Sequence, residues 1–252
     1  MVKNDLLLEG CEELLNRHNL TMVEGVSVSR EIQLAILIDM FRESHTTLSA
    51  ISRLMIELAK NPDVQEKIYQ ETKELISRGD PLSYKDVQQQ SYVKACVKEL
   101  FRTRPLLSFL TRQVSRDITL PSGYEIPGGK NVVFLMREYG DQEKYFKDSN
   151  IFRPERWLKN RNKEMVLESS DCPIDSLHYP EDKTDIPKFA ILPFGHGQRF
   201  CTGRRIAENM MVIFMMKIAN KCVIHTLTDF ECYSNLFVKP KGQIDVKLEE
   251  RK

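Results

Sequence analysis

The sequence lacks any hydrophobic run long enough to cross a membrane. A transmembrane helix needs about 20 consecutive apolar residues, and the best apolar runs of this chain, 34–38 and 210–216, are much shorter. The first residues also lack the pattern of a secretory or organelle-targeting segment, because Asp5, Glu9 and Glu12 interrupt the early apolar positions. We therefore expect the printed chain to contain neither a membrane span nor a targeting segment.

An excess of charge of one sign is also missing. The 37 basic and 36 acidic residues give a formal net charge of +1, which argues against nucleic acid as the partner. Close pairs of cysteines are missing too, since the six cysteines stand at positions 11, 96, 172, 201, 222 and 232. This spacing excludes a disulfide framework and a zinc ribbon. It favours reduced thiols in a reducing compartment.

The residues that are present indicate a mainly α fold with a small β region. Apolar periodicity predicts one long helix over about 31–60, a second from Pro62 to Gly79 and a third over about 91–104 that Pro105 ends. Asn61 and Pro62 form a helix start, as N-cap and first helical residue. A short helix over 5–20 and a loop over 21–30 precede them.

The middle of the chain has β-branched residues and turns instead of helical periodicity. We expect strands over 113–120, 124–126 and 131–136, and short strands over 223–250. Residues 138–192 are expected to be mostly irregular. A last helix is predicted over about 202–221, and its methionines are expected to pack in the core.

Residues 194–207 form the most informative stretch, Phe-Gly-His-Gly-Gln-Arg-Phe-Cys-Thr-Gly-Arg-Arg-Ile-Ala. Cys201 stands at the mouth of the predicted last helix, where the helix dipole and the nearby charge of Arg199 favour a thiolate. A thiolate is the form of cysteine that binds iron, and Gly203 leaves room for a flat ligand over the turn. The simpler alternative, a buried cysteine beside a helix cap, suits a lone cysteine but not this whole pattern.

This stretch resembles the haem-binding signature of cytochrome P450 monooxygenases. The resemblance implies a haem b whose iron is held by the thiolate of Cys201, with Arg199 pairing a haem propionate. Phe194 and Gly203 belong to the same cofactor-binding signature. Arg112 stands where many members of the family place a second propionate-binding arginine.

Two further motifs agree with the family. Residues 98–102, Lys-Glu-Leu-Phe-Arg, contain its E-x-x-R pair, and residues 152–157, Phe-Arg-Pro-Glu-Arg-Trp, are similar to its Pro-Glu-Arg-aromatic box. The resemblance implies a buried structural triad of Glu99, Arg102 and Arg156. Without the family pattern, Glu99 and Arg102 would be interpreted as a solvated ion pair on a helix.

The subgroup that the haem-binding stretch resembles is the mitochondrial class. That class implies a mitochondrial, inner-membrane-associated protein and a ferredoxin-type electron donor. Electrostatic steering would bring an acidic ferredoxin to a basic surface. Four residues are candidates for it, although any one of them could equally be a solvated side chain: Lys94, Lys98, Arg204 and Arg205.

The predicted long helix departs from the family at the distal side of the haem. The family pattern there is Ala-Gly-x-acid-Thr-Thr, whereas residues 42–47 read Arg-Glu-Ser-His-Thr-Thr. Thr46 would help to protonate iron-bound dioxygen, and His45 is a candidate proton shuttle because imidazole titrates near neutral pH. Arg42 and Glu43 replace the small pair and could obstruct the pocket. The alternative is that Arg42 and His45 face solvent or an ion pair.

The resemblance implies that residues 1–252 are the C-terminal part of one cytochrome P450-like domain, with an N-terminal part missing. Within it we expect the long distal helix at about 31–60, the E-x-x-R helix at about 91–104 and the haem-cysteine loop with its helix at about 193–221. The implied function is a haem-thiolate monooxygenase that inserts one oxygen atom of dioxygen into a lipophilic, sterol-like substrate. The alternatives are a non-catalytic fragment that holds haem without turnover or not at all, and a protein that only binds the redox partner.

Overall fold

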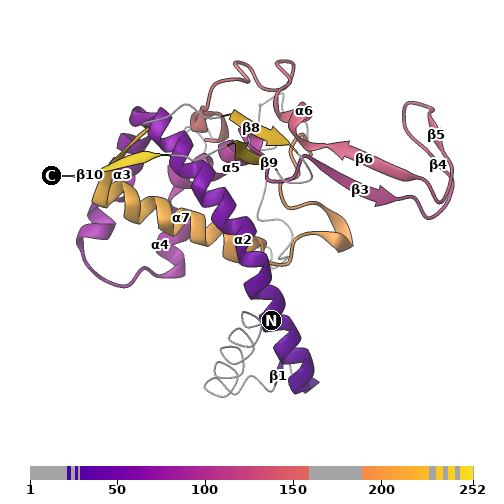
Figure 1. The fold of residues 1–252 in the computed structure, drawn as a ribbon, viewed down its shortest axis with the longest axis horizontal. Helices are drawn as coiled ribbons and strands as arrows, with labels where there is room; N and C mark the ends of the chain where they lie inside the picture. The colour runs from indigo at the N-terminus through magenta and orange to yellow at the C-terminus, as the bar shows by residue number, and fades with distance from the viewer. Residues whose placement is uncertain are drawn as a thin grey trace, which may run out of the picture. The chain divides into compact units, whose positions relative to one another are not determined.

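A computed structural model describes residues 22–23, 26–27, 29–158, 189–226, 231–234, 238–241 and 245–251 of the chain. The side chains of residues 22–23, 26–27, 36, 40–43 and 231–241 are outside the description, as is the helix predicted over 5–20. The chain divides into two compact units, Met1–Ser49 and Ala50–Lys252, and each is described by itself. The helix α2 (Arg30–Lys60) begins in the first unit and continues into the second (Figure 1).

The first unit contains a short strand pair where a loop was predicted. Strand β1 (Met22–Val23) pairs antiparallel with β2 (Val26–Ser27). The prediction of a loop over 21–30 is therefore wrong for these residues, because the paired residues Val23 and Val26 are β-branched and favour a strand.

In the described part of the second unit, four helices lie between α2 and the Cys201 loop. They are α3 (Pro62–Ser77), α4 (Tyr84–Gln89), α5 (Ser91–Thr103) and α6 (Met136–Gly140). Asn61 takes the N-cap position of α3 as predicted, but its side chain makes no cap bond and donates to the carbonyl of Glu57 instead. Helix α4 was not predicted, although Ser83 and Asp86 form a capping box at its start.

The strands of the second unit form separate antiparallel pairs. Strand β3 (Phe109–Gln113) pairs with β6 (Asn131–Leu135), and β4 (Ile118–Thr119) pairs with β5 (Glu125–Ile126). The strand predicted over 113–120 is therefore right for Ile118 and Thr119 of β4 but wrong over 114–117, where Val114 bonds to the turn at residues 129–130. Strand β3 lies earlier in the chain than predicted. Strand β7 (Cys222–Thr226) pairs with β10 (Val246–Glu250), and β8 (Glu231–Ser234) pairs with β9 (Val238–Lys241).

Helices α3 and α5 pack against α7 (Arg204–Lys221) and enclose the larger buried cluster (Figure 1). The predicted apolar face of α5 is confirmed, because Val93, Val97, Leu100 and Phe101 are all buried. Three of the four methionines of α7 are buried as predicted, whereas Met210 is 43% exposed. The described elements are thus mainly helical with small sheets, which confirms the predicted fold class.

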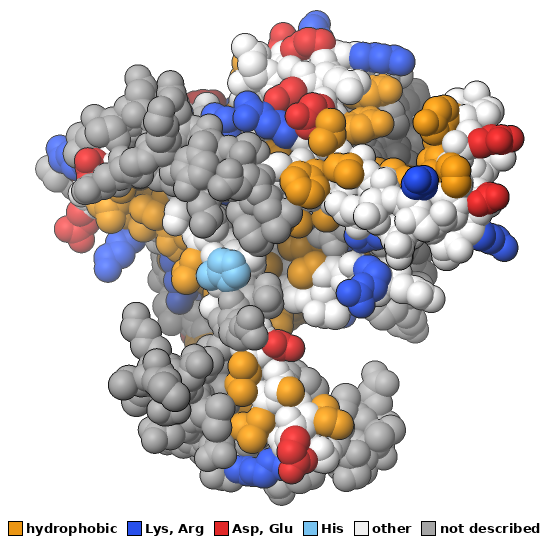
Figure 2. Space-filling view, turned by 45° about the vertical axis from the view of Figure 1, so that its right-hand side comes forward, with side chains coloured by type: hydrophobic (Ala, Val, Ile, Leu, Met, Phe, Trp, Pro, Cys, Tyr) orange, Lys and Arg blue, Asp and Glu red, His pale blue; other side chains and the backbone are white. Residues whose placement is uncertain are grey.

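A second, smaller buried cluster lies beside α5. It consists of Ala95, Phe146, Trp157, Ala190 and Ile191. Hydrophobic side chains also reach the surface among charged ones on the face shown in Figure 2. Among the described helices, none combines the length and the apolar character needed to span a membrane.

Candidate functional site

The carboxylate of Glu99 is the centre of a buried hydrogen-bond network on α5. Glu99 and Arg102 lie one helical turn apart, and the side chains of both are fully buried. Arg102 donates from Nη2 to Oε1 of Glu99 at 2.7 Å and from Nε to Oε2 at 3.0 Å. The interpretation as a solvated pair is therefore excluded, because both side chains are fully buried. Removing both charges from water is favourable only with this bidentate geometry and further partners.

The other nitrogen bonds of Arg102 go to backbone carbonyls of the following segment. Nη1 donates to the carbonyls of Gly140 at 2.8 Å and Ser149 at 2.7 Å, and Nη2 also donates to that of Ile151 at 3.0 Å. Buried carbonyls need donors as much as the guanidinium needs acceptors. Arg102 consequently fixes the path of residues 140–151 on α5.

Two further side chains reach Glu99 from the 3₁₀ turn η1 (Pro154–Trp157). Arg156 donates from Nε to Oε1 at 2.9 Å, and its side chain is 6% exposed. Burial lowers the pKa of Arg156, while the charge of Glu99 opposes that shift. Trp157 donates from Nε1 to Oε2 at 2.8 Å. The structure thus brings together the three residues named for the triad and adds the tryptophan indole.

Sequence reasoning missed two features of this network. Gly140 approaches α5 so closely that a Cβ there would lie 2.5 Å from the carbonyl oxygen of Arg102; nothing in the local sequence distinguishes it from other turn glycines. Glu155, inside the same box, accepts from Lys67 at 2.6 Å and from the Tyr92 hydroxyl at 3.1 Å. The box is therefore anchored to α3 through Glu155 and to α5 through Glu155, Arg156 and Trp157.

The loop that contains Cys201 is shaped by its own backbone hydrogen bonds. The amide of Gly195 donates to Leu192, that of Phe200 to Gly197 and that of Cys201 to Phe194, at 2.9, 3.0 and 2.8 Å. Gly195 and Gly197 have φ angles of +74° and +73°, a region that favours glycine. This path leaves Cys201 as an exposed free thiol just before α7.

Phe194 anchors the cysteine loop to α5. Its ring meets that of Phe101 edge-on, with centroids 5.0 Å apart and planes at 72°, a favourable aromatic geometry. The guanidinium of Arg204 also lies over the ring of Phe194, 5.8 Å from its centroid. Helix α5 therefore contacts both the Glu99 network and the cysteine loop.

Arg112 and Gly195 meet where β3 passes the loop. A Cβ on Gly195 would lie 3.6 Å from Nη2 of Arg112, so the structure brings this predicted arginine to the cysteine loop. Arg199 is exposed on the same loop. Gly203 lies at the start of α7, where a Cβ would be in ordinary contact, 3.9 Å from the sulfur of Cys201.

The side chains around Cys201 suit the haem that the resemblance implies. The thiol of Cys201 is exposed, and the loop and α7 also expose three apolar side chains, namely Phe200, Ile206 and Met210. Arg112 and Arg199 supply two cations for the carboxylates of such a ligand. Within the described part of the chain, no group of three or more His, Cys, Asp or Glu side chains offers another metal site.

The four basic residues proposed to face a redox partner differ in their surroundings. Lys94 is half-buried and donates to the backbone and side chain of Gln88 at 3.1 and 3.2 Å, and burial lowers its pKa. Arg204 is 15% exposed and is paired with Glu208, and Lys98 is half-buried. Only Arg205 of the four is fully at the surface.

The predicted distal residues belong to the first unit. His45 is exposed there and Thr46 is half-buried. The side chains of Arg42 and Glu43 lie outside the described part of α2. These residues are not among those that the second unit brings together, so their roles remain predictions.

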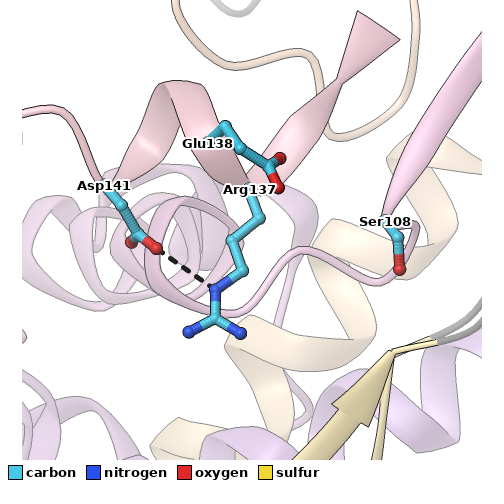
Figure 3. Close-up of a pocket in the computed structure, with 4 residues that line it drawn as sticks. All are labelled: Ser108, Arg137, Glu138 and Asp141. Carbon is cyan, nitrogen blue, oxygen red and sulfur yellow. Dashed lines mark hydrogen bonds and ion pairs between the residues drawn. The ribbon is translucent and has the colours of Figure 1, made fainter. Parts of the chain in front are cut away.

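A surface hollow of about 500 Å³ lies at α6, with Ser108 across from two residues of the helix and from Asp141, its C-cap (Figure 3). Arg137 is paired with Asp141 at 3.1 Å, and Glu138 completes the lining. This polar, mixed-charge hollow contains no residue that the sequence predicted for the site.

Comparison with known proteins places these motifs in context. The sequence model of the family described as "Cytochrome P450" matches residues 9–248. "Probable cytochrome P450 12b2, mitochondrial" of Drosophila melanogaster is 32% identical over 225 residues, which are 88% of this chain and 40% of that protein. "Cytochrome P450 10" of Lymnaea stagnalis is 32% identical over 234 residues, 91% of this chain and 39% of that protein.

A mammalian relative has a named activity. "1,25-dihydroxyvitamin D(3) 24-hydroxylase, mitochondrial" of Mus musculus is 29% identical over 209 residues, which are 83% of this chain and 35% of that protein. The chain therefore spans less than half the length of these curated relatives.

Proposed function

The chain belongs to the cytochrome P450 family, and from this premise we propose that it is the haem-thiolate part of a monooxygenase. The observation that supports this most directly is the position of the Cys201 thiol, exposed on a loop that Phe194 and Arg112 join to α5 and β3. A haem bound there would supply the activation of dioxygen for insertion of one oxygen atom into a substrate.

The chain's own residues have distinct tasks in this proposal. The sulfur of Cys201 would bind the haem iron. Arg112 and Arg199 would hold the two propionates, and Phe194 keeps the loop against α5. Glu99, Arg102 and Arg156 do not touch the cofactor; they fix residues 140–156 on the helix that supports the loop.

The distal proton path is proposed from sequence positions alone. We infer that the hydroxyl of Thr46 would donate a proton during the activation of dioxygen and that the imidazole of His45 would resupply it. Arg42 and Glu43, in place of two small residues, would narrow the distal pocket and restrict the substrates that enter.

The substrate and partners follow from the relatives' class. We propose a lipophilic, sterol-like substrate, since one relative is named for a vitamin D hydroxylation. A ferredoxin-type electron donor and a mitochondrial site of action agree with the mitochondrial names of several relatives. Among the candidate contacts Arg205 is the best placed for an acidic partner, because it is exposed.

A second candidate function is a protein that binds haem or the redox partner without turnover. It is favoured by Arg42 and Glu43, which replace two small residues in the distal motif. Retention of the cysteine loop and of the Glu99 network favours the monooxygenase.

The test is a carbon monoxide difference spectrum of the reduced, haem-reconstituted chain. We expect a strongly red-shifted Soret band, which requires a thiolate ligand. Cys201→Ser should lose this band, whereas Cys222→Ser, at a buried cysteine of β7, should keep it. A red-shifted band that survives Cys201→Ser would refute the ligand assignment. Absence of haem uptake by the wild type would favour the non-catalytic candidate.

A further inference from the structure

Trp157, the single tryptophan of the chain, touches two parts of the site at once. Its indole N–H donates to Oε2 of Glu99 at 2.8 Å. Its ring belongs to the small buried cluster that also contains Ala190 and Ile191, the residues that lead into the Cys201 loop. The N–H of the indole therefore bonds to the Glu99 network, whereas its apolar ring belongs to the cluster at the entrance of the loop.

The two oxygens of Glu99 receive unequal sets of donors. Oε1 accepts from Arg102, from Arg156 and from the amide of Arg153, at 2.7, 2.9 and 2.9 Å. Oε2 accepts only from Nε of Arg102 and from Trp157, among the described residues. Without the indole N–H, Oε2 of Glu99, a fully buried carboxylate oxygen, would keep a single donor. A buried acceptor that loses a donor costs free energy.

We propose that Trp157 is a positioning residue that couples the Glu99 network to the segment entering the Cys201 loop. Its N–H holds the indole in one orientation, and the fixed ring holds residues 190–191. The loop that begins there carries Gly195 and Cys201. The relevance of this coupling to catalysis rests on the proposed function, but the coupling itself belongs to the haem-free chain.

The first test is Trp157→Phe, which removes the N–H and keeps an aromatic ring beside Phe146, now 6.1 Å from the indole. Hydrogen bonds to charged groups contribute about 1.5–3 kcal/mol, so the unfolding equilibrium constant should rise about 13- to 160-fold. In a Glu99→Gln background, Trp157→Phe should change the unfolding equilibrium constant less than about threefold. An equal change in both backgrounds would mean that Trp157 contributes packing only.

The second test separates positioning from general stability. Amide exchange of Gly195 and Cys201, measured on the haem-free chain, should be at least about fivefold faster in Trp157→Phe. The matched control is Gln65→Ala, which removes the side-chain bonds that join α3 to Ile224 of β7 and should leave loop exchange unchanged. Equal acceleration in the two variants would overturn the proposal.

A third measurement uses the wild type, so that it does not depend on a variant folding. Because Trp157 is the only tryptophan, its emission reports on this one site. In urea, the red shift of the emission and the loss of protection at Gly195 and Cys201 should occur at the same concentration. Loss of loop protection while the emission remains that of a buried indole would refute the coupling. None of these readouts requires haem. A chain that fails the carbon monoxide test can therefore still show the coupling, and the two failures can be told apart.

Discussion

At the scale of single residues, the site depends on which backbone groups a side chain can reach. Arg102 and Arg156 donate to carbonyls of residues 140–151 as well as to Glu99. Two guanidinium groups and one carboxylate leave one positive charge in excess, and the carbonyl dipoles of this segment compensate for it. The irregular path of the segment is thus determined by the cations it surrounds.

Gly140 gives a prediction at this scale. In Gly140→Ala the new Cβ would lie 2.5 Å from the carbonyl oxygen of Arg102, so α6 must move away from α5. We expect a loss of about 1–3 kcal/mol in the free energy of unfolding, typical of overpacking, measured by urea denaturation. The control is Gly203→Ala, whose Cβ meets only the sulfur of Cys201 at 3.9 Å. Equal free energies of unfolding of the two variants would show that α6 can move away from α5 without a loss of stability.

At the scale of elements, periodicity predicted the helices well and the connections poorly. The apolar face of α5 and the stop at Pro105 follow from local sequence, and the structure has both. The bonds of Glu155 to Lys67 and Tyr92 join residues that are far apart in the chain, so no local pattern contains them. The strand β3 was misplaced for a related reason, because its end is set by partners near residue 130.

The last described residue shows how such distant partners hold an element. Arg251 follows β10, and its guanidinium lies 4.2 Å from the ring centroid of Tyr69 on α3. Its Nε donates to the carbonyl of Ala219 near the end of α7, and Nη1 pairs with Glu66 at 2.6 Å. A cation at the carboxyl end of a helix is favourable. Arg251 therefore joins β10, α7 and α3.

Substituting this residue tests the junction. Arg251→Ala should lower the free energy of unfolding by roughly 1–2 kcal/mol, since it removes one carbonyl bond and one cation–π contact. Backbone amides of β7 and β10 should exchange faster. Lys247→Ala is the matched control, because that exposed lysine of β10 has only a 3.7 Å ion pair with Glu249. Similar effects of the two substitutions would contradict the junction.

At the scale of the whole molecule, the family signature predicted more than the periodicity did. The signature alone implied that Glu99, Arg102 and Arg156 meet, and they do. The nearly equal numbers of basic and acidic residues do not predict which charged side chains form pairs in the fold. The described acids with a resolved shift illustrate the point, because their pKa values are all lowered by partners that composition does not reveal: Glu31, Glu66, Asp86, Glu143 and Glu155.

Lowered carboxyl pKa values predict how the chain responds to acid. A carboxyl group whose pKa is lower in the folded than in the unfolded chain stabilises the fold above its unfolded pKa, and this contribution is lost as the pH falls through the folded pKa. Burial raises the pKa of Glu155, but the bonds from Lys67 and Tyr92 outweigh it and the pKa falls below the usual 4.5. The hydrogen bond to Glu155 raises the pKa of Lys67, so the lysine remains charged throughout the acid range.

Glu155→Gln measures this contribution. At neutral pH the variant should unfold at a lower urea concentration than the wild type, because Lys67 loses its charged acceptor. The difference between the two midpoints should shrink from about pH 5 to about pH 3, as Glu155 of the wild type becomes protonated in the folded chain. Glu250→Gln, at an exposed position of β10, serves as the control. A midpoint difference that stays constant across this range would show that Glu155 acts through its shape and not through its charge.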